Sequence, residues 1–233
     1  CRSPAEAKKY NGVVEQVYAE IDQALGRCMK RVGDATTVMV MSDHGFCNFS
    51  RGFGLNSWLK EKGYLVADSS LSDADWSKSQ AYGLGLNGLY VNLKGREQFG
   101  IVDPAQRDAL LKKISKELLA VRDPKDGKQV IRRVYRTDEC YKGPEAVNAP
   151  DLIVGYERDY RASWNTCLGG FDKELVVDNT SPWSADHCIA HDVVPGIIVT
   201  NRRVQKSEPS SVDIAPTILA AFGIRTPAQT AAR

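Results

Sequence analysis

The sequence predicts an α/β fold, and three observations lead to this prediction. Apolar residues recur at helical spacing over residues 7–32, as they do along one face of an amphipathic helix. This helix would end at Gly33, and a short apolar run over residues 37–41 follows almost at once, which is half of an α/β repeat. A second amphipathic helix follows Asp103-Pro104, where proline suits the first helical position.

The composition bounds the class of protein. With 233 residues, of which 42% are apolar, the chain can form one large domain with a sizeable core. A net charge of +2 gives no electrostatic reason to expect nucleic acid or a membrane surface as partner. No window approaches the roughly 18 uninterrupted apolar residues of a membrane-spanning helix, so we expect none. Residue 1 is Cys, without an initiator Met or a secretion signal, so we expect a processed chain or part of a longer one.

Six cysteines are scattered along the chain without a Cys-x-x-Cys pair. This spacing argues against a zinc knuckle and does not suggest a disulfide framework. A reducing, cytoplasmic compartment is the simpler interpretation. Cys47 and Cys188 are interpreted as small buried hydrophobic residues and not as thiolate ligands.

The run Thr37–Met41 is short, apolar and followed by a turn signal, which predicts a strand buried on both faces. Asp43 and His44 come at its end, where open α/β sheets place their chemistry, and Gly45 lets the chain turn away. One carboxylate oxygen and one imidazole nitrogen suit a divalent transition metal. The alternative is an Asp that caps the next segment and a His that is hydrogen-bonded in a loop.

The rest of the chain alternates between strand, helix and loop patterns. A hairpin is expected over residues 81–93, turning at Asn87-Gly88, and residues 64–100 are interpreted as a possible β-hairpin insertion. Residues 156–179 resemble a long loop, which is typical of a lid, a binding loop or disorder. A polar turn over residues 183–188 holds a second Asp-His pair.

Three motifs, in order, resemble those of the alkaline phosphatase superfamily. Met41–Phe46 is similar to its Ser-Asp-His-Gly motif, Trp183–His187 to the segment of its last metal-ligand histidine, and Asp213–Leu219 to its C-terminal helix. Further segments resemble the type I phosphodiesterase/nucleotide pyrophosphatase branch: Leu55–Leu59, Gly95–Glu97, Pro150–Tyr156 and Val194–Gly196.

The resemblance implies a three-layer α/β/α sandwich of the alkaline phosphatase type, with residues 1–233 as the C-terminal portion of one such domain and a small β-rich insertion. It also implies two divalent metal ions, zinc or alternatively manganese, that clamp a phosphate while a Thr or Ser attacks. Carried over onto this chain, Asp43 and His44 would hold one ion and His187 the other.

The nucleophile that the resemblance implies has no counterpart in residues 1–233, so we expect it in an N-terminal half that this chain requires, and the isolated chain to be inactive. The implied activity is hydrolysis of phosphate mono- or diesters, with a small-molecule phosphate ester or nucleotide as substrate. The alternatives are a phosphomutase of the same superfamily and a binding or regulatory domain that has lost catalysis.

Five further residues are candidates for supporting roles. Asp186 is a candidate acceptor for the free N–H of a ligating imidazole, or else it caps a turn. The candidates for a wall facing the substrate are Asn87, Tyr90, Arg161 and Trp164, and Arg161 would suit a phosphate oxygen. The alternative for the wall residues is an anchoring role that ties loops to the core.

Overall fold

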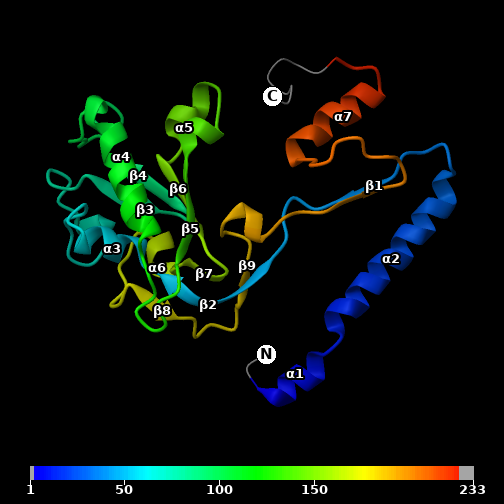
Figure 1. The fold of residues 1–233 in the computed structure, drawn as a ribbon, viewed down its shortest axis with the longest axis horizontal. Helices are drawn as coiled ribbons and strands as arrows, with labels where there is room; N and C mark the ends of the chain where they lie inside the picture. The colour runs from blue at the N-terminus through cyan, green and yellow to red at the C-terminus, as the bar shows by residue number, and fades with distance from the viewer. Residues whose placement is uncertain (1–2, 226–233) are drawn as a thin grey trace. The chain divides into compact units, whose positions relative to one another are not determined.

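The computed structural model describes residues 3–225, and the chain forms two compact units (Figure 1). The first unit contains the chain up to Asp43 and from Ile197 onward, and the second runs from His44 to Gly196. Both combine helices with strands, so the predicted α/β class is confirmed. Within the described residues, no helix is both long and apolar enough to cross a membrane.

Within residues 3–225, the first unit has four helical segments and two strands. They are α1 (Pro4–Tyr10), α2 (Val13–Val32), β1 (Met39–Met41), β10 (Ile198–Thr200), the short 3₁₀ helix η4 (Ser211–Asp213) and α7 (Ile214–Ala221). The single helix predicted over residues 7–32 is divided, because Gly12 adopts a left-handed conformation with φ of 83°. Gly33 ends α2 as predicted, and no residue of α2 is buried.

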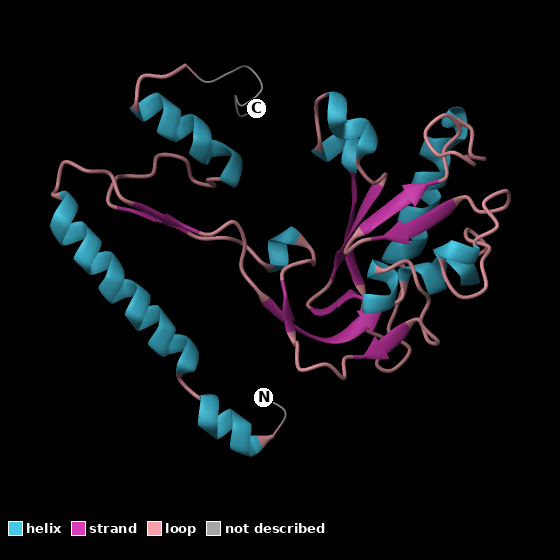
Figure 2. Ribbon diagram, turned by 180° about the vertical axis from the view of Figure 1, so that it is seen from behind, coloured by secondary structure: helices cyan, strands magenta, loops and turns pink. Residues whose placement is uncertain are grey.

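Strand β1 pairs only with β10 within residues 3–225, in antiparallel register, and the two form a ribbon (Figure 2). The prediction that this strand is buried on both faces is therefore wrong for the described structure. Met39 and Val40 are half-buried and Met41 is 43% exposed. An apolar run predicts a strand, but its burial depends on neighbours that lie elsewhere in the chain.

The second unit contains two four-stranded sheets. One has the order β3-β4-β6-β5, from Ala81–Leu84, Gly88–Val91, Leu152–Tyr156 and Ile131–Arg136. In the other, β2 (Cys47–Phe53) pairs with β7 (Asp159–Ala162), β8 (Val176–Asp178) and β9 (Ala185–Asp186). The helices are α3 (Leu55–Glu61), α4 (Pro104–Leu119), α5 (Thr137–Cys140) and α6 (Trp164–Cys167), with the 3₁₀ helices η1 (Leu71–Asp73), η2 (Pro144–Asn148) and η3 (His191–Val193).

Local sequence signals account for α4 and for the hairpin. Asp103 caps α4 by accepting a hydrogen bond from the Ala105 N–H, and three residues of the predicted apolar face, Leu111, Ile114 and Leu118, are buried. The hairpin β3-β4 is confirmed, with its turn over residues 85–87, slightly earlier than predicted. The interpretation of residues 64–100 as an insertion stays a prediction.

The long loop predicted over residues 156–179 instead holds β7, α6 and β8. Strand β7 runs parallel to β2, and β8 runs antiparallel to β2 on its other side. These partners are more than a hundred residues away in the sequence, since Gly52 pairs with Arg161 and with Val177. A local pattern does not indicate such distant pairing.

The carboxylate of Asp151, at the start of β6, joins three parts of the second unit. Its side chain is 0% exposed and lies 2.6 Å from both Arg96 Nη2 and Arg107 Nε. It also accepts a hydrogen bond of 2.6 Å from the Val91 N–H of β4. The carboxylate therefore ties β4, α4 and the loop after β4 to the beginning of β6.

We expect Asp151→Asn to lower the free energy of unfolding by about 3–5 kcal/mol, the usual effect of breaking a buried ion pair. Burial raises the pKa of Asp151, but hydrogen bonds from Arg96, Val91 and Arg107 outweigh it, so the pKa is lowered overall. The carboxylate then stabilises the fold above its unfolded pKa of about 3.9, and this contribution is lost as the pH falls through the lower folded value.

Urea unfolding of the wild type and of Asp151→Asn between pH 7 and pH 2 measures this effect. As the pH falls at the acid end of this range, the free energy of unfolding should decrease less steeply for the variant than for the wild type. Asp108→Asn is the control, because this carboxylate is 57% exposed and pairs with Lys112 and Arg136 at the surface. Equal decreases in the free energy of unfolding of the two variants would contradict the assigned role of Asp151.

Candidate metal centre

Gly45 is required by a close approach of two backbone segments. Its N–H donates to the Val194 carbonyl at 2.9 Å. A Cβ atom at this position would lie 2.9 Å from the Pro195 carbonyl oxygen, which is closer than real Cβ contacts. The glycine after His44 therefore lets the chain pass against residues 194–195 before β2 begins at Cys47.

The pairing of β2 with β9 brings two of the predicted ligands together. Cys47 pairs with Asp186, so His44 precedes one strand of the pair and His187 follows the other. The imidazole rings of His44 and His187 are stacked, with centroids 3.9 Å apart and planes 5° from parallel. Phe46 presents its ring at a steep angle to both imidazoles, at 5.3 and 5.5 Å.

The parallel stacking of the two imidazoles does not suit the binding of both rings to one ion. The lone pair of an imidazole nitrogen lies in the plane of its ring, so parallel rings direct their lone pairs along parallel planes. One tetrahedral ion cannot lie in both planes at a bond length of about 2.0 Å.

Asp186 lies directly behind His187 and is 6% exposed. Its Oδ1 accepts hydrogen bonds from the backbone N–H groups of His187, at 2.7 Å, and Cys188, at 3.0 Å. The same oxygen lies 3.7 Å from His187 Nδ1. Asp186 thus caps the turn, which was one of the two expectations, whereas the other, that it accepts the free N–H of a ligating imidazole, stays a prediction.

Donor atoms of Asp186, His187 and Cys188 lie within 4.8 Å of one another. Burial and the neighbouring Asp186 raise the pKa of the Cys188 thiol to about 11. Cys188 is therefore a neutral thiol at physiological pH, in keeping with its interpretation as a small hydrophobic residue. Cys47 is buried.

The structure places Arg161 in the interior, where it is 2% exposed. Its guanidinium carbon lies 4.0 Å from the ring centroid of Trp164 and 5.1 Å from that of Phe49, and its Nη1 lies 2.8 Å from Asp186 Oδ2. Trp164 itself is 52% exposed. Arg161 therefore faces Asp186, and together with Trp164 it also lines a pocket of about 190 Å³, so the assignment of these two residues to a wall facing the substrate stays a prediction.

The other predicted wall residues have anchoring contacts. Asn87 Nδ2 donates to the carbonyls of Val154, at 2.6 Å, and Cys188, at 3.1 Å, and so ties the hairpin turn to the segment after His187. Tyr90 stacks on Tyr82 with centroids 5.2 Å apart.

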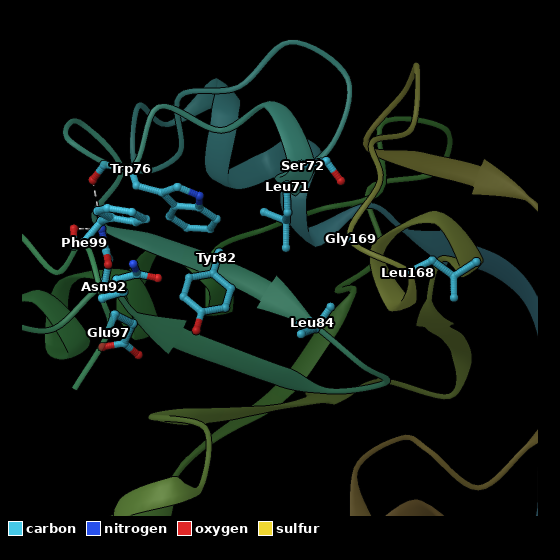
Figure 3. Close-up of a pocket in the computed structure, with 11 residues that line it drawn as sticks. Leu71, Ser72, Trp76, Tyr82, Leu84, Asn92, Glu97, Phe99, Leu168 and Gly169 are labelled. Carbon is cyan, nitrogen blue, oxygen red and sulfur yellow. Dashed lines mark hydrogen bonds between the residues drawn. The ribbon is translucent and has the colours of Figure 1, made fainter.

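A separate cleft of about 470 Å³ lies beside β3 (Figure 3). Its lining includes Leu71, Trp76, Tyr82, Leu84, Asn92, Phe99 and Leu168. Asn92 Nδ2 donates to the carbonyls of Trp76, Ser79 and Phe99, and so holds the loops on that side together. The volume suits a small molecule. The cleft contains none of the predicted metal ligands, and no periodic pattern in the sequence indicated it.

Comparison with known proteins gives one family match. A family model described as type I phosphodiesterase / nucleotide pyrophosphatase matches residues 3–166. This range includes Asp43 and His44 and ends before His187. A search of the curated proteins finds no match.

We expect Gly45→Ala to separate His44 from His187, because the added Cβ would meet the Pro195 carbonyl. Loss of the ring-to-ring nuclear Overhauser effects between the two imidazoles measures this, together with a loss of about 1–3 kcal/mol in stability from overpacking. Gly26→Ala in α2 is the control, since nothing lies within 4 Å of its added Cβ. An unchanged stack in Gly45→Ala would contradict the prediction.

Proposed function

The chain belongs to the type I phosphodiesterase / nucleotide pyrophosphatase family, and on that premise we propose that it forms part of a metal-dependent hydrolase of phosphate mono- or diesters. The family itself establishes a phosphoesterase domain of the phosphodiesterase/pyrophosphatase type, which acts on a small-molecule phosphate ester. In the proposed site, Asp43 and His44 hold one divalent ion and His187 holds the other. Zinc is the proposed metal because imidazole and carboxylate donors suit it.

The stacked pair of His44 and His187 is the observation that carries this proposal. Two divalent ions bound there would polarise the phosphate oxygens and neutralise the charge that develops on them. The chain's own residues have simpler tasks. The two imidazoles bind the metal ions. Phe46 packs on both rings and limits their movement. Asp186 holds the backbone of His187 in place.

We place the nucleophile, a Thr or Ser, outside residues 1–233. Ser42 is the hydroxyl nearest in sequence to the Asp-His pair, and its bonds support a structural role. Its N–H donates to the Ile197 carbonyl and its Oγ accepts from the Ile197 N–H, both at 3.0 Å. Ser42 therefore continues the β1-β10 ribbon. The exposed apolar residues of α2, including Val14, Val17 and Ile21, provide a surface on which a preceding segment would pack.

Replacement of the proposed ligands tests the metal site. The chain has three histidines, so His191 is a matched control. His191 lies on η3 and its Nδ1 is 3.0 Å from the Tyr135 hydroxyl. In the complete native protein, His44→Ala, His187→Ala and Asp43→Ala should each lower zinc affinity by at least about 100-fold, which is more than the 10–100-fold cost of losing a residue that only supports a ligand.

Metal content and hydrolysis of bis(p-nitrophenyl) phosphate are measured together in these variants. His191→Ala should keep both. If Asp43→Ala keeps its metal and its activity, the assignment of that ligand is wrong. If His191→Ala loses as much zinc as His187→Ala, the stacked pair is not the metal site.

Activity of residues 1–233 alone tests the location of the nucleophile. We expect the purified chain to hydrolyse phosphate esters no faster than the metal ions in buffer, because it lacks the attacking hydroxyl. The complete native protein, assayed at the same zinc concentration, should be active. Turnover by the chain alone that disappears in Ser42→Ala would place the nucleophile at Ser42 instead.

A further inference from the structure

A buried pair of opposite charges lies directly behind the candidate ligand His187. Arg161 Nη1 and Asp186 Oδ2 are 2.8 Å apart, and the two side chains are 2% and 8% exposed. Arg161 lies on β7 and Asp186 on β9, and both strands pair with β2. The central strand β2 therefore sets the position of both charges.

A buried ion pair of this kind contributes little net free energy to the stability of a fold. Removing two charges from water costs more than their attraction returns unless the remaining hydrogen bonds are made. Nε of Arg161 donates to the Ala162 carbonyl at 3.0 Å. Its two terminal nitrogens are buried and make no hydrogen bond of acceptable geometry among the described residues. Buried polar groups left in this state call for an explanation other than stability.

A second buried pair in the same unit shows what a fully bonded arrangement looks like. Arg51 on β2 donates from Nε and Nη2 to Asp123, at 2.9 and 2.8 Å, and from Nη1 to Asp178. The Tyr160 hydroxyl donates to the same Asp123 carboxylate at 3.0 Å. This pair has its hydrogen bonds satisfied and touches neither imidazole of the stack, so its role is structural.

Contacts of Asp186 connect Arg161 to His187. Oδ2 meets the guanidinium, while Oδ1 accepts the backbone N–H groups of His187 and Cys188. Oδ1 also lies 3.7 Å from His187 Nδ1, which is beyond hydrogen-bond distance but close enough for its negative charge to favour a proton on that nitrogen. A proton on Nδ1 leaves the lone pair on Nε2. The guanidinium, which packs on Trp164 and Phe49, thus holds the carboxylate that holds the backbone of His187 and lies next to its imidazole.

We propose that Arg161 is a positioning residue, which acts through Asp186 to keep His187 stacked on His44 with Nε2 as its metal-binding nitrogen. The metal-binding part of this inference rests on the proposed function. Arg161 is assigned no phosphate contact in this role, because both of its terminal nitrogens are buried and Nη1 faces Asp186. It is the orientation of His187 that depends on the arginine.

Arg161→Met and Arg161→Lys test the proposal, with Arg51→Met as the matched control. Nuclear magnetic resonance of metal-free chain at one fixed alkaline pH follows the imidazoles, which are easily assigned because there are three. We expect Arg161→Met to lose the ring-to-ring Overhauser effects of His44 and His187 and to mix the tautomers of His187. Arg161→Lys keeps a cation beside Asp186 and should retain part of both signals, which keeps the test decisive if the methionine variant does not fold.

Zinc titration of the complete native protein is the second measurement. Arg161→Met should bind zinc about 10–100-fold more weakly than the wild type, the usual cost of losing a residue that orients a ligand. Arg161→Lys should lose less of its zinc affinity than Arg161→Met. Arg51→Met should lose stability but keep the stack, the tautomer and the zinc affinity.

The outcomes separate this inference from the proposed function. A stack and a tautomer unchanged in both Arg161 variants would overturn the positioning role, and so would an equal loss of the stack in Arg51→Met. Wild-type protein that binds no zinc, while the Arg161 variants still lose the stack, would refute the proposed metal site and leave the orienting role of Arg161 supported.

Discussion

The pairing of β2 with β9 is the constraint on which the candidate site depends. Its register sets Cys47 opposite Asp186, and the residues that flank this pair, His44 and His187, are then close enough to stack. Side chains alternate between the two faces of a strand, so a shift by one residue would turn Asp186 away from Arg161. The pairing also explains Gly45, because the chain entering β2 must pass against residues 194–195.

Buried carboxylates have two different uses in the second unit. Asp151 is surrounded by two arginines and a backbone N–H, and it joins elements that are distant in the sequence. Asp186 has one arginine whose terminal nitrogens lack hydrogen bonds, and it accepts from the backbone of His187. The first arrangement stabilises the fold. The second is poorly bonded for that purpose, and its place beside an imidazole fits the orientation of a ligand.

The family match and the stacked imidazoles concern overlapping parts of the chain. The family match covers residues 3–166 and so includes His44, whereas His187 lies beyond it. The two residues nevertheless stack in the structure. The cleft beside β3 is separate from the candidate metal centre, since none of the candidate ligands lines it. Its aromatic lining and the triple hydrogen bonding of Asn92 give it a defined shape without assigning it a reaction.

By itself, the sequence determined the features that depend on neighbours a few residues apart. Asp103-Pro104 starts α4, the hairpin turns before Gly88, and Gly33 ends α2, because caps, turns and helical faces are local. Only the tertiary structure decided which distant strands pair. It placed β7 and β8 in a predicted loop, left β1 only half-buried, and brought Arg161 into contact with Asp186. Burial and long-range register depend on the whole fold, and no local pattern encodes them.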